Sequence, residues 1–542
     1  MNKRPMIVTA AVLAASMNLI ACRAAQAAVV PPGVQLAAKQ VLVKNNGAEP
    51  GTLDPQKVEG VPASNISLDL FVGLTVEAPN GSIVPGVAES WTISKNHLVY
   101  TFHLRKDARW SNGKPVTAED FVYGMRRGVD PKLASAYAYF LYSIKNAKAI
   151  NDGKLPLSDL GVKALDAHTL QITLNEPAPY FLQIVSQPTT FPEYKPSIEK
   201  WGDKFTQPGH LVSNGAYELK SWVVNGHITL VKNPYYWDAK HVVITEVKYL
   251  PIVDSNTSMQ MVESGQSDWT YTIPSSQYKT LKAKFGDQIV TKPYLGLYYY
   301  DLNMQKPPFK GSLALRKALS LAVDRVALTK YVLGQGQIPA YNFVPKGTAG
   351  INFIQYGWAD WSNAKRIAEA QKLYKEAGYS TANPLKITIL YNTNADHKKI
   401  ALALASMWKQ ALGVQVNLEN EEWKVFLKDR QQGNYVVARD GWIGDYDYAT
   451  TFTDLFRCGV PQNNSHYCNA KYDALVKKAA DSDSEAQRVK LYTDAERVAM
   501  NDYPIIPIFQ YVALHFRSKN LRGYVGNPLD HNHSSDWYFV KP

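Results

Sequence analysis

The stretch "NYVVARDGWIGDYDY", residues 434–448, predicts a β-strand that runs into a polar loop. Residues 434–442 are rich in β-branched and aromatic side chains, so Arg439 lies near the strand end and Asp445 in the loop beyond it. Polar groups at the strand ends of open α/β sheets usually face the ligand crevice. A cation, an anion and Trp442 on one glycine-flanked segment fit three hypotheses: a catalytic pair, an internal salt bridge, or two parts of a ligand clamp.

Helices and strands alternate on both sides of this stretch from about residue 310 onwards. Apolar residues at helical spacing predict helices over 313–334, 363–379, 397–413 and 484–502. Short apolar runs predict strands over 385–392, 414–423 and 503–514. This part of the chain therefore has an α/β pattern.

The first part of the chain is richer in strands. Alternating apolar and polar residues, closed by Gly, Pro or Asn turns, predict strands over 39–47, 98–110, 168–181 and 227–237. Residues 116–130 predict a helix between them, with Thr117 and Asp120 at capping-box spacing. At 542 residues the chain exceeds what one hydrophobic core usually holds, so we expect two or three domains.

Residues 1–27 have the pattern of a secretory signal peptide. A basic start precedes an apolar run, and residues 25–27 satisfy the small-x-small rule for cleavage. The alternative is processing before Cys22 to leave a lipid anchor, but Arg23 directly after a lipidated cysteine would be unusual. No later stretch approaches the ~18 consecutive apolar residues of a spanning helix. We therefore expect a soluble protein outside the cytoplasm.

Composition and charge narrow the class of partner. Hydrophobic residues make up 46% and charged residues 20%, which is ordinary for a globular protein. Removing the signal peptide lowers the formal charge from +12 to +9, because three basic residues leave with it. Lys and Arg are scattered among Asp and Glu without a run of five, so a solvated basic surface is favoured over a nucleic-acid site.

Two cysteines, Cys458 and Cys468, remain in the exported chain. In an oxidising compartment a close pair around a Pro/Asn/Ser loop predicts a disulfide. The competing metal site would need His466 and a fourth ligand, and C-x9-C is not a standard zinc spacing.

Signatures of enzymes are absent, but aromatic side chains are abundant. The chain has no G-x-S-x-G, H-E-x-x-H or G-x-x-x-x-G-K motif. "DHNHSSD" (530–536) carries two histidines two positions apart, for which we expect an exposed loop rather than a metal site. The 33 Tyr and 12 Trp cluster in places such as 294–303 and 233–237, as suits pockets that accept varied side chains.

Four segments, 45–74, 85–127, 297–309 and 421–448, closely resemble the periplasmic oligopeptide-binding proteins of ABC peptide importers, extracellular solute-binding protein family 5. The similarity runs from about residue 34 to the C-terminus. It implies an α/β fold: a two-lobed periplasmic binding protein of the large three-domain type, with mixed sheets and a ligand cleft between the lobes. It also implies a monomer without enzymatic activity, cofactor or metal, which captures peptides of roughly two to five residues and delivers them to a membrane permease.

The resemblance also implies how the domains divide the chain. After the signal peptide, domain I comprises residues 28–71, 196–295 and 513–542. Domain II comprises residues 72–195, and domain III, the second lobe, comprises residues 296–512.

The family's ligand-binding positions match residues of this chain. Glu59, Gly60 and Val61 match one backbone partner of the extended ligand, and the segment from Gly441 to Asp445 matches the other. Asp445 matches the aspartate that receives the ligand's α-ammonium, a group that needs a carboxylate partner when buried. Arg439 matches the cation for the carboxylate of a tripeptide-like ligand, and His397 the partner for the next length.

Side-chain pockets should be lined by the matching aromatic residues, which are Tyr137, Tyr271, Tyr294, Tyr299, Trp423, Trp442 and Tyr511. Arg430 is a further pocket cation near Trp423. Packing in the core is the alternative for each aromatic residue, first of all for Tyr299 and Tyr271.

Three departures from the family pattern bear on specificity. Val332 stands where relatives use a lysine for dipeptides, and Gly296 and Ile443 stand where close relatives carry a disulfide. Asp440 replaces a small residue. If Asp440 faced the pocket it would compete for Arg439 and favour cationic ligands, but neighbours in a strand point to opposite faces.

Other functions fit parts of the pattern. A receptor for cell-wall murein tripeptide would share the fold and the need for amine and carboxylate partners. An exported peptidase would use Glu59, Asp445 and His397 as acid and base groups, although no nucleophile or metal set accompanies them. A folding helper that grips extended chains is a third class.

Overall fold

The computed structural model describes residues 27–542. The predicted signal peptide therefore lies outside the described residues except for Ala27, and so does Cys22. Among the described residues, none of the helices combines the length and the apolar character needed to cross a bilayer.

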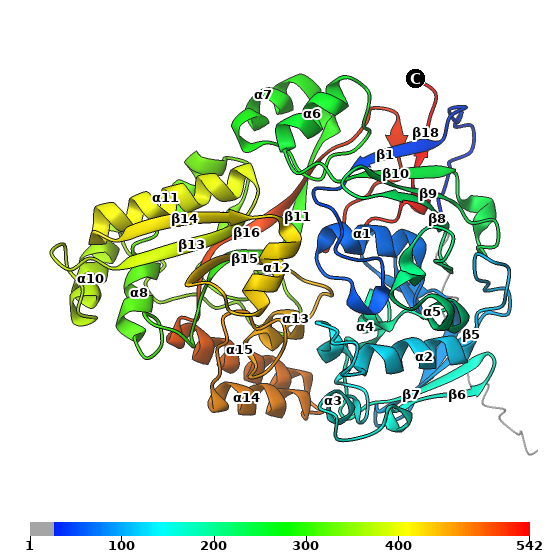
Figure 1. Ribbon diagram of the computed structural model, residues 1–542, viewed down its shortest axis with the longest axis horizontal. Coiled ribbons are helices and arrows are strands. Elements are labelled where there is room, and N and C mark those ends of the chain that lie inside the picture. The colour runs from blue at the N-terminus through cyan, green and yellow to red at the C-terminus, as the bar shows by residue number, and fades with distance from the viewer. Residues whose placement is uncertain (1–26) are drawn as a thin grey trace, which may run out of the picture.

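A six-stranded mixed sheet forms the half of the molecule at the left of Figure 1. Its strands, in spatial order, are β12 (Ile338–Pro339), β16 (Ile505–Phe516), β11 (Ile289–Leu302), β15 (Val437–Ile443), β13 (Lys386–Asn392) and β14 (Gln415–Glu421). The helices around this sheet are α8 (Leu313–Leu321), α10 (Asn363–Glu376), α11 (Ala395–Leu412), α12 (Trp423–Gln431), α13 (Thr450–Thr453), α14 (Ala470–Ala480) and α15 (Glu485–Asp502). β15 is antiparallel to β11 and parallel to β13, so the sheet is mixed, as expected.

The other half contains two four-stranded sheets. One has the order β1 (Val41–Asn45), β10 (Glu246–Leu250), β9 (His227–Lys232) and β8 (Tyr217–Val223). The other has the order β4 (Ala88–Ile93), β5 (Val99–Leu104), β7 (Thr169–Thr173) and β6 (Val162–Asp166). Helices α1 (Val61–Leu70) and α2 (Ala118–Val129) belong to this half, and Thr117 and Asp120 form the predicted capping box of α2.

Two long strands join the halves. β11 and β16 pair antiparallel and run from one half into the other (Figure 1). Their register shifts between Pro293 and Leu297, so the pairing is irregular where the strands cross between the halves. Both strands run across predicted domain boundaries, at 295/296 and 512/513, and the domain ranges remain a prediction.

Two elements differ from expectation because a cap interrupts them. The helix predicted over 313–334 breaks after Leu321, and Asp324 caps a new turn by accepting a hydrogen bond from the Ala327 amide at 3.0 Å. The buried Arg325 guanidinium fixes this break by donating to the Ser320 carbonyl at 3.0 Å. The strand predicted to reach Trp423 ends at Glu421, since Glu422 caps α12.

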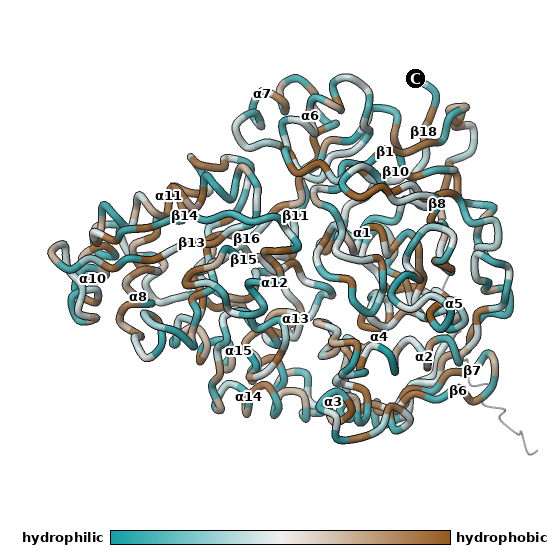
Figure 2. Tube along the Cα trace, in the orientation of Figure 1, coloured by the Kyte–Doolittle hydropathy of each residue, from teal (hydrophilic) through white to brown (hydrophobic). Residues whose placement is uncertain are grey.

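Three strands of the first part of the chain are shorter than predicted: β5, β7 and β9 end at Leu104, Thr173 and Lys232, where expectation extended them to residues 110, 181 and 237. Turn residues follow each of these strands, and Phe181 begins the short helix α4 (Phe181–Ile184). The remaining predicted helices and strands form within three residues of their expected bounds. Figure 2 shows hydrophobic segments in the interior of both halves and hydrophilic turns along much of the periphery. Each half thus has an apolar interior, and the buried apolar residues of the two halves join in one continuous cluster.

Candidate functional site

A cavity of about 510 Å³ lies between the two halves. Residues on both sides of it line the same space, for example Glu59 and Tyr137 from one half and His397 and Trp423 from the other. Enclosed sites of this size at an interface between domains commonly hold small ligands. All of the ligand-binding residues predicted from the sequence line this cavity except Tyr299.

Tyr299 is the exception because it lies on the wrong face of β11. It pairs with Asp440 of β15, is 4% exposed, and is absent from the cavity wall. Its neighbour Tyr298 lines the cavity instead, with the Arg439 guanidinium 4.7 Å from the centre of its ring. Successive strand residues alternate between faces, and the tyrosine run 298–300 offers no sequence signal for which one points inward.

Asp445 lies at one end of the cavity, in the loop that follows β15. Its backbone amide donates to the Thr451 hydroxyl at 3.1 Å, whereas its buried Oδ2 atom has no hydrogen-bond partner among residues 27–542. Burial raises the pKa of Asp445 to about 7, although the nearby His531 opposes that shift. A buried carboxylate oxygen without a donor is a site that a ligand ammonium would satisfy.

His531 lies beside Asp445 in the cavity wall. The prediction of an exposed loop over residues 530–536 is therefore wrong. Its Nδ1 atom is 2.7 Å from Oε2 of Glu77, and the Nδ1 atom of His533 is 3.1 Å from the Leu68 carbonyl. Burial disfavours the charged imidazole, yet Glu77 and Asp445 together raise the pKa of His531. This segment is polar in sequence but folds against α1, so polarity alone could not reveal its burial.

Arg439 supplies a cation to a different part of the cavity wall. Its Nη2 atom donates to the Tyr511 hydroxyl at 2.6 Å, and its Nη1 atom lies 3.4 Å from Oδ1 of Asn392. Arg439 is 8% exposed and forms no ion pair within the part of the chain that the structure describes. Its charge is therefore available to a ligand carboxylate.

His397 stands near Arg439 as an uncharged partner. Its Nδ1 atom is 3.3 Å from the Tyr298 hydroxyl. Burial, and then the charge of Arg439, lower the pKa of His397 well below its ordinary value, so the imidazole is neutral at neutral pH. A neutral imidazole can hydrogen-bond to a carboxylate but does not compensate its charge.

Asp440 faces away from Arg439, as strand alternation predicts. It is 1% exposed and forms a buried ion pair with Arg430 of α12, through Oδ1 and Nη1. The Gly441 amide and the Asn464 side chain also donate to Asp440, at 2.6 Å and 3.2 Å. Asp440 therefore engages Arg430 rather than competing for Arg439, and the predicted pocket cation Arg430 has its charge already matched.

Glu59 links the two halves. Its carboxylate accepts from Nε2 of Gln431 at 2.9 Å and from Nε2 of Gln462 at 3.1 Å. Burial raises the pKa of Glu59, against the opposing effects of Arg430 and the two amides. The adjacent Gly60 has φ +79°, and a Cβ atom there would lie 2.8 Å from the Trp423 ring. Glycine is thus required both for the backbone conformation and for the close approach of the halves.

Aromatic pairs form the rest of the wall. Tyr137 and Trp442, from opposite halves, are stacked with ring centroids 6.2 Å apart, and Tyr294 meets Tyr511 edge-on at 6.1 Å. Tyr271 lies against the backbone at Gly47, where a Cβ atom would be 2.9 Å from its ring. These rings give the cavity broad apolar faces between its charged groups.

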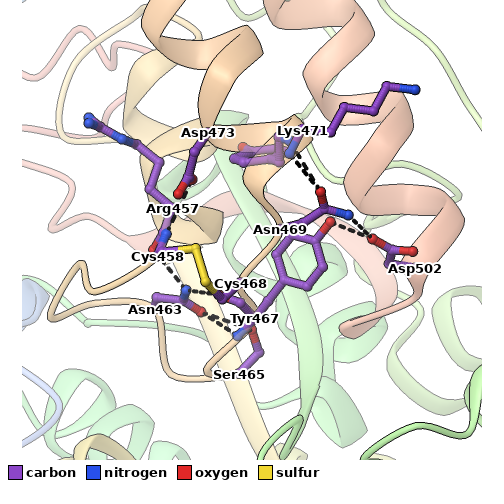
Figure 3. Close-up of a disulfide and its surroundings, with 11 residues drawn as sticks. Arg457, Cys458, Asn463, Ser465, Tyr467, Cys468, Asn469, Lys471, Asp473 and Asp502 are labelled. Carbon is purple, nitrogen blue, oxygen red and sulfur yellow. Dashed lines mark hydrogen bonds between the residues drawn. A yellow bond between two sulfur atoms is a disulfide. The ribbon is translucent and has the colours of Figure 1, made fainter.

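The predicted disulfide between Cys458 and Cys468 is confirmed (Figure 3). Within its loop the Asn463 side chain donates to the Arg457 and Tyr467 carbonyls, at 2.9 Å and 2.7 Å. The same loop carries Gln462 and Asn464, which reach Glu59 and Asp440. The disulfide therefore anchors a loop that touches both of these acids.

The structure also shows the surroundings of Gly296, Ile443 and Val332, where this chain departs from the family pattern. Gly296 pairs with Ile443, and a Cβ atom on Gly296 would lie 2.4 Å from the Ile443 Cδ1 atom, so the isoleucine occupies the space beside the glycine. Val332 packs against the hydrophobic core and is absent from the cavity wall, whereas Leu333 and Gln335 line it.

Known proteins are similar to this chain over nearly its whole length. The periplasmic oligopeptide-binding protein OppA of Escherichia coli K12 is 47% identical over 539 residues, covering 99% of this chain and 98% of its own. The crystal structure of Haemophilus influenzae OppA in complex with RPPGFSPFR has a TM-score of 0.91 at 41% identity, covering 94% of this chain and all of the other.

Solved structures of the murein tripeptide-binding protein MppA, the first from Escherichia coli, match this chain to different degrees. One structure matches with a TM-score of 0.92 at 41% identity, covering 94% of this chain and 100% of the other. The unliganded open form matches with a TM-score of only 0.68 at the same identity, covering 94% of this chain and 99% of the other. The two halves of the present chain are therefore arranged as in the first structure and not as in the open form.

The family description "Bacterial extracellular solute-binding proteins, family 5 Middle" matches residues 82–464. That match spans most of the chain, including β15 and the loop that carries Asp445. With the full-length relatives, it shows that the chain belongs to the bacterial extracellular solute-binding proteins of family 5.

Proposed function

We propose that this protein is a periplasmic receptor that captures short peptides between its two halves, largely independently of their side chains, and delivers them to an ABC-type peptide permease. The observation that carries the proposal is a cavity in which, among residues 27–542, one carboxylate oxygen of Asp445 has no hydrogen-bond partner and the Arg439 cation has no ion-pair partner. A peptide is a zwitterion, so it supplies the missing partner of each.

The backbone between these two groups supports the same ligand. Gly441 to Asp445 line the cavity as the end of β15 and the loop beyond it, and an extended peptide can bond to such a segment through its main chain. Each extended residue adds about 3.3 Å, so Arg439 and His397 would receive carboxylates of different ligand lengths. Glu59, Gly60 and Val61 lie on the facing wall.

The aromatic walls explain tolerance for different side chains. Tyr137, Tyr294, Trp442 and Tyr511 present flat faces rather than a network of fixed hydrogen-bond partners. Such surfaces accept apolar and polar side chains alike, while the charged ends fix the main chain. Affinity should therefore depend more on the two ends of the peptide than on its sequence.

The protein is proposed to bind and not to cleave its ligand. Glu59 is engaged by two glutamine amides and His397 by the Tyr298 hydroxyl, and neither contact prepares a nucleophile. The relatives reported above are binding proteins. Recovery of intact peptide after long incubation is the expected result, and cleavage products would favour the exported peptidase.

The decisive experiment is calorimetry with lysine-containing tripeptides and the same peptides after N-terminal acetylation. Acetylation removes the charge that Asp445 would bind, so affinity should fall by at least about 30-fold, since an unpaired buried charge costs about 2–5 kcal/mol. Unchanged affinity after acetylation would contradict the role of Asp445. Peptides of two to nine residues belong in the series, because the Haemophilus relative binds RPPGFSPFR.

Export and assembly state are part of the same proposal. Cleavage after Ala27 would release a soluble periplasmic monomer, and processing before Cys22 would tether it to the membrane. The mass of the mature protein distinguishes the two outcomes, and light scattering of the purified receptor tests for the monomer.

A further inference from the structure

We infer that Asp440 makes the cavity wall around Arg430, Glu59 and Trp423 a subsite for a basic or uncharged ligand side chain, and closes it to a carboxylate side chain. This inference rests on the proposed function, because it assumes that the ligand is a peptide. It names the side-chain chemistry that this receptor selects.

The first step is that the charge of Arg430 is not available to a ligand. Arg430 lines the cavity but is only 5% exposed, and its guanidinium forms an ion pair with Asp440 on the side away from Arg439. Asp440 is itself held by the Gly441 amide and the Asn464 side chain. A ligand carboxylate would have to displace a buried, hydrogen-bonded partner to reach Arg430.

The second step is that the neighbouring acid does not release Arg430 from this pair. Asp301 of β11 is buried next to Asp440, and burial, followed by the charge of Asp440, raises the pKa of Asp301 well above its ordinary value. Burial and the charge of Asp440 therefore both disfavour the ionised form of Asp301. Arg430 is matched by the single carboxylate of Asp440, and no positive charge is left over.

The third step is that Glu59 remains as the acid on the cavity side. Its bonds from Gln431 and Gln462 are made by neutral amides, so they satisfy its oxygens without cancelling its charge. An ammonium or guanidinium entering here would meet a carboxylate, and an acidic side chain would meet one of like charge. The Trp423 ring, packed on Gly60, offers the methylene stem of a long basic side chain an apolar face.

Arg439 does not contradict this assignment, because it serves a different ligand group. Its guanidinium lies with Tyr511 and Tyr298 on the other face of β15. A carboxylate at the end of the peptide main chain can therefore bind there, while a carboxylate on the side chain over Glu59 finds no free cation. The receptor should accept a peptide with one terminal carboxylate and discriminate against a second one at this position.

The test is calorimetry with Ala-Ala-Ala and with tripeptides in which Lys or Glu replaces each alanine in turn, at constant pH and salt. In the wild-type protein we expect one position at which Lys binds at least as well as Ala, and Glu binds at least ten-fold more weakly. In Asp440→Asn, which leaves Arg430 without its partner, Glu at that position should gain at least ten-fold relative to Ala. In Glu59→Gln, the preference for Lys over Ala there should disappear.

Two further variants separate this effect from a general change of charge. Asp429→Asn removes the same charge from the same helix as Arg430, but Asp429 does not line the cavity, so the Glu-to-Ala ratio should stay as in the wild type. The double variant Arg430→Gln with Asp440→Asn removes both charges of the pair, and the gain for Glu should vanish.

Several results would overturn the inference. Glu binding as well as Ala at every position of the wild type would do so, and so would an unchanged Glu-to-Ala ratio in folded Asp440→Asn. If circular dichroism shows that Asp440→Asn does not fold, the wild-type ratios and Glu59→Gln decide the question. Failure of the wild type to bind any of the tripeptides would instead contradict the proposed function.

Discussion

Asp440 and Asp445 lie five positions apart in one segment, but their carboxylates differ in how many partners the protein itself supplies. Asp440, behind the sheet, has an arginine, a backbone amide and an asparagine as partners. Asp445, at the end of the cavity, has one buried oxygen that no donor of the described chain reaches, and its pKa is raised to about 7. A carboxylate whose partners are all built in supports the fold, whereas one left unsatisfied is prepared for a ligand.

The largest effect is expected on stability, when the fully partnered Asp440 is replaced. Asp440→Ala removes the ion-pair partner of the buried Arg430, and the free energy of unfolding should fall by about 3–5 kcal/mol. Urea denaturation of the peptide-free protein measures it, with Asp429→Ala as the control on the neighbouring surface. A fall below about 1 kcal/mol would mean that Arg430 finds another partner or solvent.

The next largest effect is expected on peptide affinity, when Asp445 is replaced. Asp445→Asn should weaken binding of a free tripeptide by at least about 30-fold, because the ligand ammonium loses its counterion at a buried site. The peptide-free variant should be no less stable than the wild type at pH 8, since burial of the ionised carboxylate opposes folding there. Calorimetry and thermal unfolding report the two quantities. A variant that binds normally, or one that unfolds easily, would contradict the contrast with Asp440.

The pH dependence of affinity sharpens the comparison. The pKa of Asp445 is raised to about 7 in the peptide-free protein, and a bound ammonium would lower it. Affinity should therefore be highest near pH 7–8, where Asp445 is ionised and the ligand's α-ammonium, with an ordinary pKa of about 7.7–8.0, still carries much of its charge. Below pH 7 affinity should fall by up to about ten-fold per pH unit, because the protein takes up a proton when the peptide leaves. Asp445→Asn should abolish the slope, and His531→Asn should shift it, because the nearby His531 opposes the rise of the Asp445 pKa. A flat profile between pH 5 and 8 would speak against an ionised Asp445 as the ligand partner.

The smallest effect on affinity is expected at Glu59. Its carboxylate is intermediate between those of the two aspartates, because neutral amides are its hydrogen-bond donors. Gln462→Ala removes one of its amide donors and one contact between the halves, so peptide affinity should fall by only about five-fold, the usual effect of one hydrogen bond. Ser465→Ala, in the same loop but without a contact to Glu59, is the matched control for calorimetry. A loss greater than fifty-fold would mean that Glu59 depends on this amide as strictly as Asp440 depends on Arg430.

Much of the fold followed from the sequence, because helix and strand periodicities are strong in the segments that build both halves. The family resemblance then predicted which residues line the cavity. Tyr299 was predicted to line the cavity but lies on the other face of β11, and no local pattern tells which tyrosine of the run 298–300 faces inward. The alternation rule did place Asp440 on the face away from Arg439.

The contacts that the sequence could not supply are those made across long separations. Asp440 finds Arg430 and Asn464 only when β15, α12 and the disulfide loop pack together. His531 comes to lie beside Asp445 and Glu77, although a short polar segment with two histidines gives no sign of burial. Such charge partners depend on tertiary packing, which neither hydrophobic periodicity nor spacing encodes.

The loop closed by Cys458 and Cys468 ties the chemistry of the site to the cellular compartment. Bonds of this kind form outside the cytoplasm, and a chain still in the reducing cytosol would hold Gln462 and Asn464 without a covalent restraint. The reduced protein should thus bind peptides less tightly than the oxidised one, because the loop that contacts Glu59 and Asp440 loses its covalent restraint.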